Sequence, residues 1–355
     1  MNKTIKVLEF LFLFCALLVI SCTHSVTKTS EPEMRDQWAT LIRNLETGKD
    51  SLLMLGTTPF GVVSVEGDNY KLLLLDGSKG IIVDKNGLIV KELNRFYDCE
   101  LSPNRQMYAY VLDDGLYVND LESNTEIVHF KDNEHKYLYP AFSPDNSKIA
   151  FVSINTETYE HFLTEYSFVN KRIKRDSFVG PIVNPFYNKP NDLFFFQHLY
   201  VHGNEPDSIQ LCRINTETEH VKVIYSEPAF FTELFNEQYI CMEIMSESSQ
   251  NSNTIYFHWV NHNIINHICL YKCDLQTLSV FKIAEYSTNF MWTKPANLPD
   301  HHLIFFGGIL LDTESYNREK IFHSEELTHY RACFFIYNNA RYLAYNKVIK
   351  VPVTN

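Results

Sequence analysis

Ala141-Phe-Ser-Pro-Asp-Asn-Ser-Lys-Ile-Ala-Phe151 is the stretch of this sequence that decides its fold. Its two apolar ends flank a Ser-Pro-Asp-Asn turn, a pattern typical of a β-hairpin. Asn146 tolerates the left-handed backbone conformation that such tight turns require. The stretch therefore predicts two antiparallel strands that are joined at Pro144.

The same hairpin pattern occurs more than once along the chain. Residues 96–111 match residues 137–152 at an offset of 41 positions, and a third copy is expected at Pro185, where Asn-Pro replaces Ser-Pro. A second kind of turn between apolar strands recurs at 118–125, 214–218 and 273–277. Two hairpins per repeat make a four-stranded unit, and a series of such units predicts a β-propeller.

The turns of the first hairpin in each repeat, such as the one at Pro144, give the number of blades. The candidates are Gly67-Asp68, Pro103, Pro144, Pro185, Asn236, Pro299-Asp300 and Asn338-Asn339. Residues 38–355 then divide into seven blades of about 45 residues, which is near the usual repeat length, whereas six blades would need about 53. The sequence predicts an all-β fold, a single propeller of four-stranded antiparallel blades, with seven blades favoured and six as the alternative.

The two ends of this region are expected to share one blade. Residues 41–55 look like the second hairpin of a unit, and residues 331–345 look like the first hairpin. Their pairing would close the ring with N- and C-terminal strands and would cover two exposed sheet edges. In the alternative, the tail from Lys347 to Val353 supplies the third strand and the N-terminus supplies only the fourth.

The hairpin at 141–151 resembles the TolB-type repeat, in which Ser-Pro-Asp-Gly turns join the two inner strands of a blade. Asn146 stands here in place of the glycine. The resemblance implies a TolB-like β-propeller lipoprotein of the bacterial envelope, of the uncharacterised Bacteroidetes type. Such relatives are commonly six-bladed, and the resemblance implies no specific activity.

The first residues predict export. A basic start precedes an apolar run from Val7 to Ile20, which is too short to span a bilayer comfortably and is typical of a signal peptide. Val19-Ile-Ser-Cys22 resembles the lipobox of bacterial lipoproteins, which implies that Cys22 carries the lipid. An uncleaved signal anchor or a simple secretory signal is the alternative.

The predicted leader divides the chain into three segments. We predict a signal peptide over residues 1–21, the lipidated Cys22 with a flexible tether over 22–37, and the propeller domain over 38–355. The position after the cysteine is Thr23, which is not acidic. The predicted location is the bacterial envelope, with a lipid anchor in the outer membrane that faces the periplasm.

The net charge, the cysteine spacing and the absence of known motifs each exclude a class of partner, cross-link or cofactor. The formal net charge is −12, so the surface repels phosphate backbones and nucleic acid is an unfavourable partner. The cysteines show no disulfide framework, and Cys269 and Cys273 are too far apart along a strand to bridge. No spacing indicates a metal site, and no phosphate or dinucleotide motif indicates a cofactor.

Propellers bind ligands around the mouth where their innermost strands begin. Aromatic residues stand seven positions before four of the predicted turn prolines: Phe96, Tyr137, Phe178 and Trp292. They could stack on a sugar or a peptide, or they could pack between blades. The polar residues predicted to add contacts there are Asp98, Glu100, Glu233 and Arg331.

The favoured function is a non-catalytic envelope propeller that binds a protein, a peptide or a glycan at one face. The chain lacks a Gly-x-Ser-x-Gly nucleophile motif. The alternative is a carbohydrate-active envelope enzyme on a propeller scaffold. It would use two of the carboxylates Asp98, Glu100 and Glu233 facing each other across the channel.

Overall fold

The computed structural model contains strands and turns in every part that it describes. The described residues are 34–96, 98–178, 180–199, 207–229, 243–246, 253–261, 267–287, 292–294, 296–298, 302–306, 309–320 and 329–352. No helix of this part is long and apolar enough to cross a membrane. Residues 38–348 form one compact unit, and the described residues of the other unit are 34–37 and 349–352.

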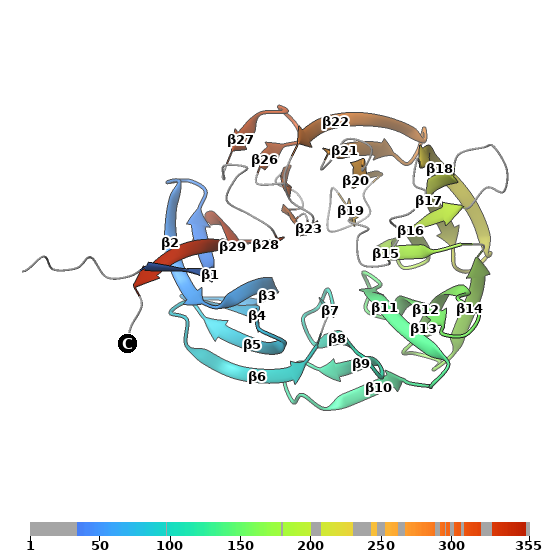
Figure 1. The fold of residues 1–355 in the computed structure, drawn as a ribbon, viewed down its shortest axis with the longest axis horizontal. Coiled ribbons are helices and arrows are strands. Elements are labelled where there is room, and N and C mark those ends of the chain that lie inside the picture. Colours follow the sequence, from blue (N-terminus) through green and yellow to red (C-terminus); the bar gives the residue numbers. More distant parts are fainter. Residues whose placement is uncertain are drawn as a thin grey trace, which may run out of the picture. The chain divides into compact units, whose positions relative to one another are not determined.

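Seven blades surround the centre of the compact unit, and in most of them the first strand is innermost (Figure 1). Three consecutive blades follow the closing sheet. They are β3 (Thr57–Glu66), β4 (Asn69–Asp76), β5 (Lys79–Asp84) and β6 (Ile89–Arg95); β7 (Asp98–Leu101), β8 (Met107–Leu112), β9 (Gly115–Asp120) and β10 (Glu126–Phe130); and β11 (His135–Phe142), β12 (Lys148–Asn155), β13 (His161–Ser167) and β14 (Ile173–Phe178).

Three further blades continue around the ring. They are β15 (Ile182–Lys189), β16 (Asp192–Leu199), β17 (Asp207–Asn215) and β18 (His220–Ala229); β19 (Glu243–Ser246), β20 (Thr254–Asn261), β21 (His267–Asp274) and β22 (Ser279–Ser287); and β24 (Ala296–Leu298), β25 (Leu303–Phe306), β26 (Ile309–Asp312) and β27 (Arg318–Lys320). The prediction of a seven-bladed propeller is confirmed, and the six-bladed alternative is wrong.

The closing blade takes strands from both ends of the chain. Its order is β2 (Lys49–Leu55), β1 (Met34–Asn44), β29 (Ala340–Pro352) and β28 (His329–Tyr337), with the short β23 (Trp292–Lys294) parallel to β28. The predicted sharing of one blade by two N-terminal and two C-terminal strands is confirmed. The alternative for the tail is wrong, because the residues from Lys347 onward continue β29 and do not form a third strand.

The Ser-Pro turns are held by their serine hydroxyls. Ser143 Oγ donates to Asp145 Oδ1 over 2.6 Å and accepts from the Lys148 N–H over 2.9 Å. Asn146 has a φ of 60°. Ser102 makes the corresponding bond with the Met107 N–H over 2.9 Å. The left-handed turn predicted from the sequence is therefore present.

The third copy of the hairpin turn is misplaced in the prediction. Pro185 lies inside β15, and the turn itself is at Pro190-Asn191. Tyr139, before Pro140, has a φ of 55°, and Asn184, before Pro185, has a φ of 51°, each at a register shift of an inner strand. Pro185 therefore matches Pro140 of the bulge and not Pro144 of the turn.

The other predicted first-hairpin turns divide into two groups. Gly67-Asp68 joins β3 to β4, and Asn338-Asn339 joins β28 to β29 with two positive φ values. Asn236 and Pro299-Asp300 lie outside the described residues. The three second-kind turns, at 118–125, 214–218 and 273–277, join the third strand of a blade to the fourth as predicted.

Apolar residues of successive strands fill the spaces between blades. Phe194 and Phe196 of β16 belong to one cluster with Phe257 of β20. Leu193 and Phe195, which alternate with them, belong to a second cluster with Val152 of β12. The β15–β18 blade therefore buries both faces, because successive side chains of a strand point to opposite sides.

We predict that Leu72→Ala destabilises the ring at its closure. Leu72 is fully buried between the closing blade and the β3–β6 blade, in a cluster with Ile42 and Phe335. The cavity should lower the free energy of unfolding by about 2–5 kcal/mol in denaturant titrations. Leu88→Ala is the matched control, because Leu88 is 64% exposed and its truncation should cost under about 0.5 kcal/mol. Equal losses from both changes would contradict the packing described here.

Candidate functional site

Strand register places a set of polar side chains on one face of the β15–β18 blade. Lys189 pairs with Asp192, Asp192 with Asn215, and Asn215 with His220. Cross-strand partners project to the same side of a sheet. The row therefore runs across all four strands at the end where the β15–β16 and β17–β18 turns lie.

A second row on the same face continues the set inward. Phe194 pairs with Arg213, and Arg213 pairs with Lys222. Phe194 also packs toward the β19–β22 blade. The polar rows therefore mark the turn end of the face that looks toward that blade.

These residues line a cleft of about 460 Å³. Its walls are Lys189, Pro190, Asn191, Asp192, Arg213, Asn215, His220 and Lys222. The volume lies in the range of small-molecule sites. We call this site the basic cleft.

The basic cleft carries an excess of positive charge. Three cationic side chains face one carboxylate, Asp192, and that carboxylate is already held by Arg213. Arg213 Nε donates to Asp192 Oδ1 over 2.5 Å and Nη2 donates to Oδ2 over 3.0 Å. Lys189 and Lys222 have no ion-pair partner among the described residues. The cleft therefore attracts anions, although the whole chain is acidic.

Arg213 is fixed in place by more than its ion pair. Its Cζ lies 5.6 Å from the centroid of the Phe194 ring, a cation–π geometry. Lys222 stands directly across the ladder, and like charges in this position repel each other. A bound anion would relieve that repulsion.

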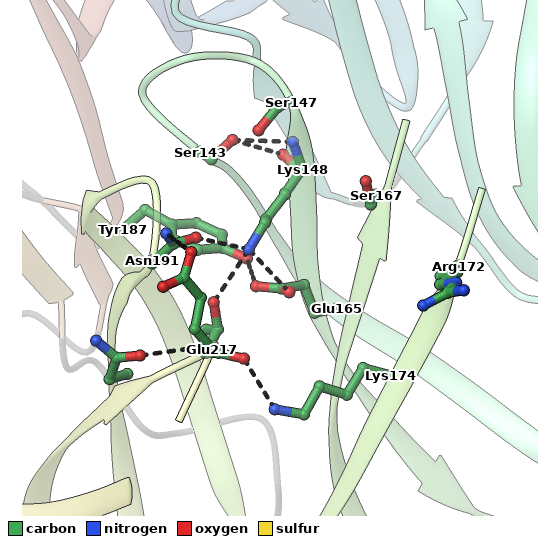
Figure 2. Close-up of polar contacts among 12 residues, drawn as sticks. Ser143, Ser147, Lys148, Glu165, Ser167, Arg172, Lys174, Tyr187, Asn191 and Glu217 are labelled. Carbon is green, nitrogen blue, oxygen red and sulfur yellow. Dashed lines mark hydrogen bonds and ion pairs between the residues drawn. The ribbon is translucent and has the colours of Figure 1, made fainter. Parts of the chain in front are cut away.

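The opposite face of the same blade holds a satisfied ion-pair network (Figure 2). Lys148 of β12 lies 3.2 Å from Glu165 Oε1 and donates to Asn191 Oδ1 over 2.8 Å and to Thr216 Oγ1 over 3.1 Å. Tyr187 donates its hydroxyl proton to Glu165 Oε2 over 2.6 Å. The network joins the β11–β14 blade to both turns that border the basic cleft.

A second lysine strengthens this attachment. Lys174 of β14 donates to the Thr216 carbonyl over 3.0 Å and lies 3.1 Å from Glu219. Asn191 Nδ2 donates to Glu217 Oε1 over 2.5 Å. Burial, followed by the neighbouring Glu165 carboxylate, raises the pKa of Tyr187 well above its usual value. Tyr187 therefore keeps its hydroxyl proton near neutral pH and donates it to Glu165.

The aromatic residues predicted at the mouth lie against other blades. Phe96 is 1% exposed and meets Phe60 edge to face at 5.5 Å. Tyr137 is buried and donates to Asp132 Oδ2 over 2.7 Å. Phe178 meets Phe195 of the next blade edge to face at 4.9 Å. These contacts correspond to the packing alternative, and a role in ligand binding stays a prediction.

The polar candidates are distributed over several inner strands. Asp98 and Glu100 both lie on β7, two residues apart and half-buried. Trp292 lies on β23 and Arg331 on β28, where the two short segments pair in parallel. Glu233 lies outside the described residues. In the described part of the chain, Asp98 and Glu100 therefore share one strand. The strand that carries Trp292 pairs with the strand that carries Arg331.

Thiol chemistry and metal binding find no support in the described residues. Cys99, Cys212, Cys269, Cys273 and Cys333 are free thiols there. Burial raises the pKa of Cys212 to about 12 and that of Cys273 to about 11, so neither is a reactive thiolate near neutral pH. No group of three metal-ligating side chains occurs within the described ranges.

The basic cleft was not predicted from the sequence. The turn at 214–218 was recognised, but antiparallel pairing on either side of it also places Arg213 opposite Lys222 and Asn215 opposite His220. That signal was present in the sequence. The contribution of Lys189 was hidden, because the β15–β16 turn was expected at Pro185.

No protein-family model and no curated protein sequence matches this chain. Among solved structures, oligogalacturonate lyase from Vibrio parahaemolyticus superposes with a TM-score of 0.56 and 12% identity, over 89% of this chain and 98% of that one. Kuenenia stuttgartiensis hydrazine synthase gives a TM-score of 0.52 and 10% identity, over 79% and 88%. TolB from Acinetobacter baumannii gives 0.46 and 15%, over 88% and 63%.

The similarity to the first two structures shows a common β-propeller fold. TolB proteins are among the structural neighbours. At these identities the roles of the neighbours do not transfer, and the neighbours themselves differ in role.

We predict that Lys148→Met destabilises the protein far more than Lys222→Met. Removing Lys148 leaves the half-buried Glu165 carboxylate without its cation, which should cost about 3 kcal/mol of unfolding free energy in denaturant titrations. Lys222 is exposed and faces Arg213, so its removal should change stability by under about 0.5 kcal/mol.

Adding Glu165→Gln to Lys148→Met should recover part of the loss, because the unpaired charge is then gone. A double variant as unstable as the sum of the two single variants would contradict the network.

Proposed function

We propose that this protein is a non-catalytic propeller that binds an acidic saccharide in the basic cleft. The observation that carries the proposal is the pair Arg213 and Lys222, which face each other beside a cleft of about 460 Å³. Lys222 has no carboxylate partner among the described residues. Two like charges held this close are stabilised when an anion binds between them.

A carboxylate suits this pair better than a neutral group. The guanidinium of Arg213 presents planar donors, and Lys222 supplies a mobile point charge. Asp192 occupies only part of the hydrogen-bonding capacity of Arg213, through Nε and Nη2. The remaining guanidinium hydrogens are available to a ligand carboxylate.

The other walls of the basic cleft suit hydroxyl groups. Asn191, Asn215 and Asp192 offer amide and carboxylate atoms, and the aromatic Phe194 beneath Arg213 is fully buried. A ligand that carries both carboxylates and hydroxyls matches this lining, and acidic sugars have both. Oligogalacturonate, the substrate in the name of the similar Vibrio lyase, is therefore a reasonable first probe.

The cellular location is part of the proposal. The leader over residues 1–21 and the lipobox-like Val19–Cys22 support a lipid-anchored protein of the bacterial envelope, in the outer membrane facing the periplasm. Such a protein would hold its ligand close to the membrane.

The catalytic alternative is a carbohydrate-active envelope enzyme. Asp98 and Glu100 lie on one strand, β7, and so do not face each other across the channel. The candidate that would face them, Glu233, lies outside the described residues. We therefore retain binding without turnover as the proposal, and the same assay checks for turnover.

We expect the full-length protein, purified in detergent, to bind tri-galacturonate and not its methyl ester in calorimetric titrations. Lys222→Met should weaken binding about tenfold, and added salt should weaken it further because the attraction is electrostatic. Lys171→Met is the matched control, since Lys171 is exposed on a turn of the β11–β14 blade. Equal affinity for the acid and the ester would contradict the proposal, and appearance of unsaturated products would favour the enzyme.

The anchor has a separate test. In a bacterial host, the full chain should incorporate a clickable fatty acid and fractionate with membranes, and Cys22→Ala should abolish both, because its thiol is the proposed acylation site. Cys15→Ala is the control, since Cys15 lies within the apolar run and should leave labelling intact. Labelling that survives Cys22→Ala would contradict lipidation at this cysteine.

A further inference from the structure

We infer that the basic cleft contains two separate subsites for acidic groups and therefore selects an oligomer with at least two acidic units. The first subsite is Arg213 with Lys222, and the second is Lys189. The inference rests on the proposed function, since it specifies the ligand of the same cleft.

The two cationic positions lie well apart across the blade. Arg213 is on β17 and Lys222 on the adjacent β18, whereas Lys189 ends β15. Neighbouring strands are about 4.8 Å apart, so Lys189 lies about 10 Å from β17 and about 14 Å from β18 across the sheet. The strand positions that carry the two subsites are therefore two and three strands apart.

The space between the subsites is polar but not cationic. Asp192 and Asn215 occupy the two middle strands of the row that starts at Lys189. The Asp192 carboxylate is buried and paired with Arg213, and it repels a second anion at this point. A ligand that spans the cleft therefore needs a neutral, hydrogen-bonding middle and an acidic group at either end.

The turn that follows Lys189 is held by hydrogen bonds on the side of the blade opposite the basic cleft. The turn residue Asn191 accepts a hydrogen bond from Lys148 over 2.8 Å and donates one to Glu217 over 2.5 Å (Figure 2). Lys148 is itself held by Glu165. The backbone that carries Lys189 is thus ordered before a ligand binds, which lowers the entropic cost of the second contact.

Linked sugar units satisfy these conditions together. Each acidic unit brings one carboxylate, and the hydroxyls between two carboxylates can meet Asp192 and Asn215. Once one unit is bound, the second meets Lys189 at a high effective concentration. Affinity should therefore rise steeply from one acidic unit to the length that spans the cleft.

The test compares galacturonate, di-galacturonate and tri-galacturonate on the full-length protein and two variants. The wild type should bind the trimer at least about tenfold more tightly than the monomer. Lys189→Met should remove that gain, so that the variant binds the trimer little more tightly than the monomer, whereas Lys222→Met should weaken all three ligands. Lys171→Met serves again as the control, and circular dichroism checks that each variant is folded.

The outcomes separate the two proposals. If monomer and trimer bind equally and Lys189→Met changes neither, the two-subsite inference is overturned while the basic cleft remains a binding site. If no acidic sugar binds the wild type, the proposed function fails and the inference fails with it. A loss of monomer affinity in Lys189→Met equal to the loss for the trimer would also overturn the inference, because it would make the cleft a single site.

Discussion

The structure depends on apolar packing between neighbouring blades. The β15–β18 blade buries both faces, as the alternating clusters of Leu193 with Phe195 and of Phe194 with Phe196 show. A blade with an uncovered face would expose a large apolar surface, so the ring is stable only when it is closed. Closure places strands from both ends of the chain in one sheet. Ile42 of β1 and Phe335 of β28 lie in one buried cluster with Leu72 of β4.

The same two-sided arrangement explains the electrostatics of the β15–β18 blade. At its turn end, one face meets the β11–β14 blade, and there Lys148 finds a carboxylate, an amide and a hydroxyl. The other face looks toward the β19–β22 blade, and there Lys189 and Lys222 lack ion-pair partners within the described residues. Residues of one short turn, 189–192, therefore serve a structural network on one side and a candidate binding site on the other.

The position of this site differs from the expected one. Propeller ligands were expected at the mouth where inner strands begin, because recurrent aromatic residues stand there. Phe96, Tyr137 and Phe178 pack against side chains of neighbouring blades, and their role in ligand binding stays a prediction. The basic cleft lies at the opposite end of its blade, where the strands turn, and its charge contrasts with the net charge of −12 of the whole chain.

The sequence by itself determined the repeat, and it favoured seven blades and a shared closing blade, because hairpin turns and period-two apolar patterns are local and survive in the residues. It located the Ser143 turn correctly but misplaced the next one, since the Asn-Pro at 184–185 also fits a bulge. Only the tertiary structure brought Lys189, Arg213 and Lys222 to one cleft, because their meeting depends on register across four strands. It also decided which lysines are neutralised, since Lys148 finds its partners on another blade and the sequence carries no record of which blade faces come into contact.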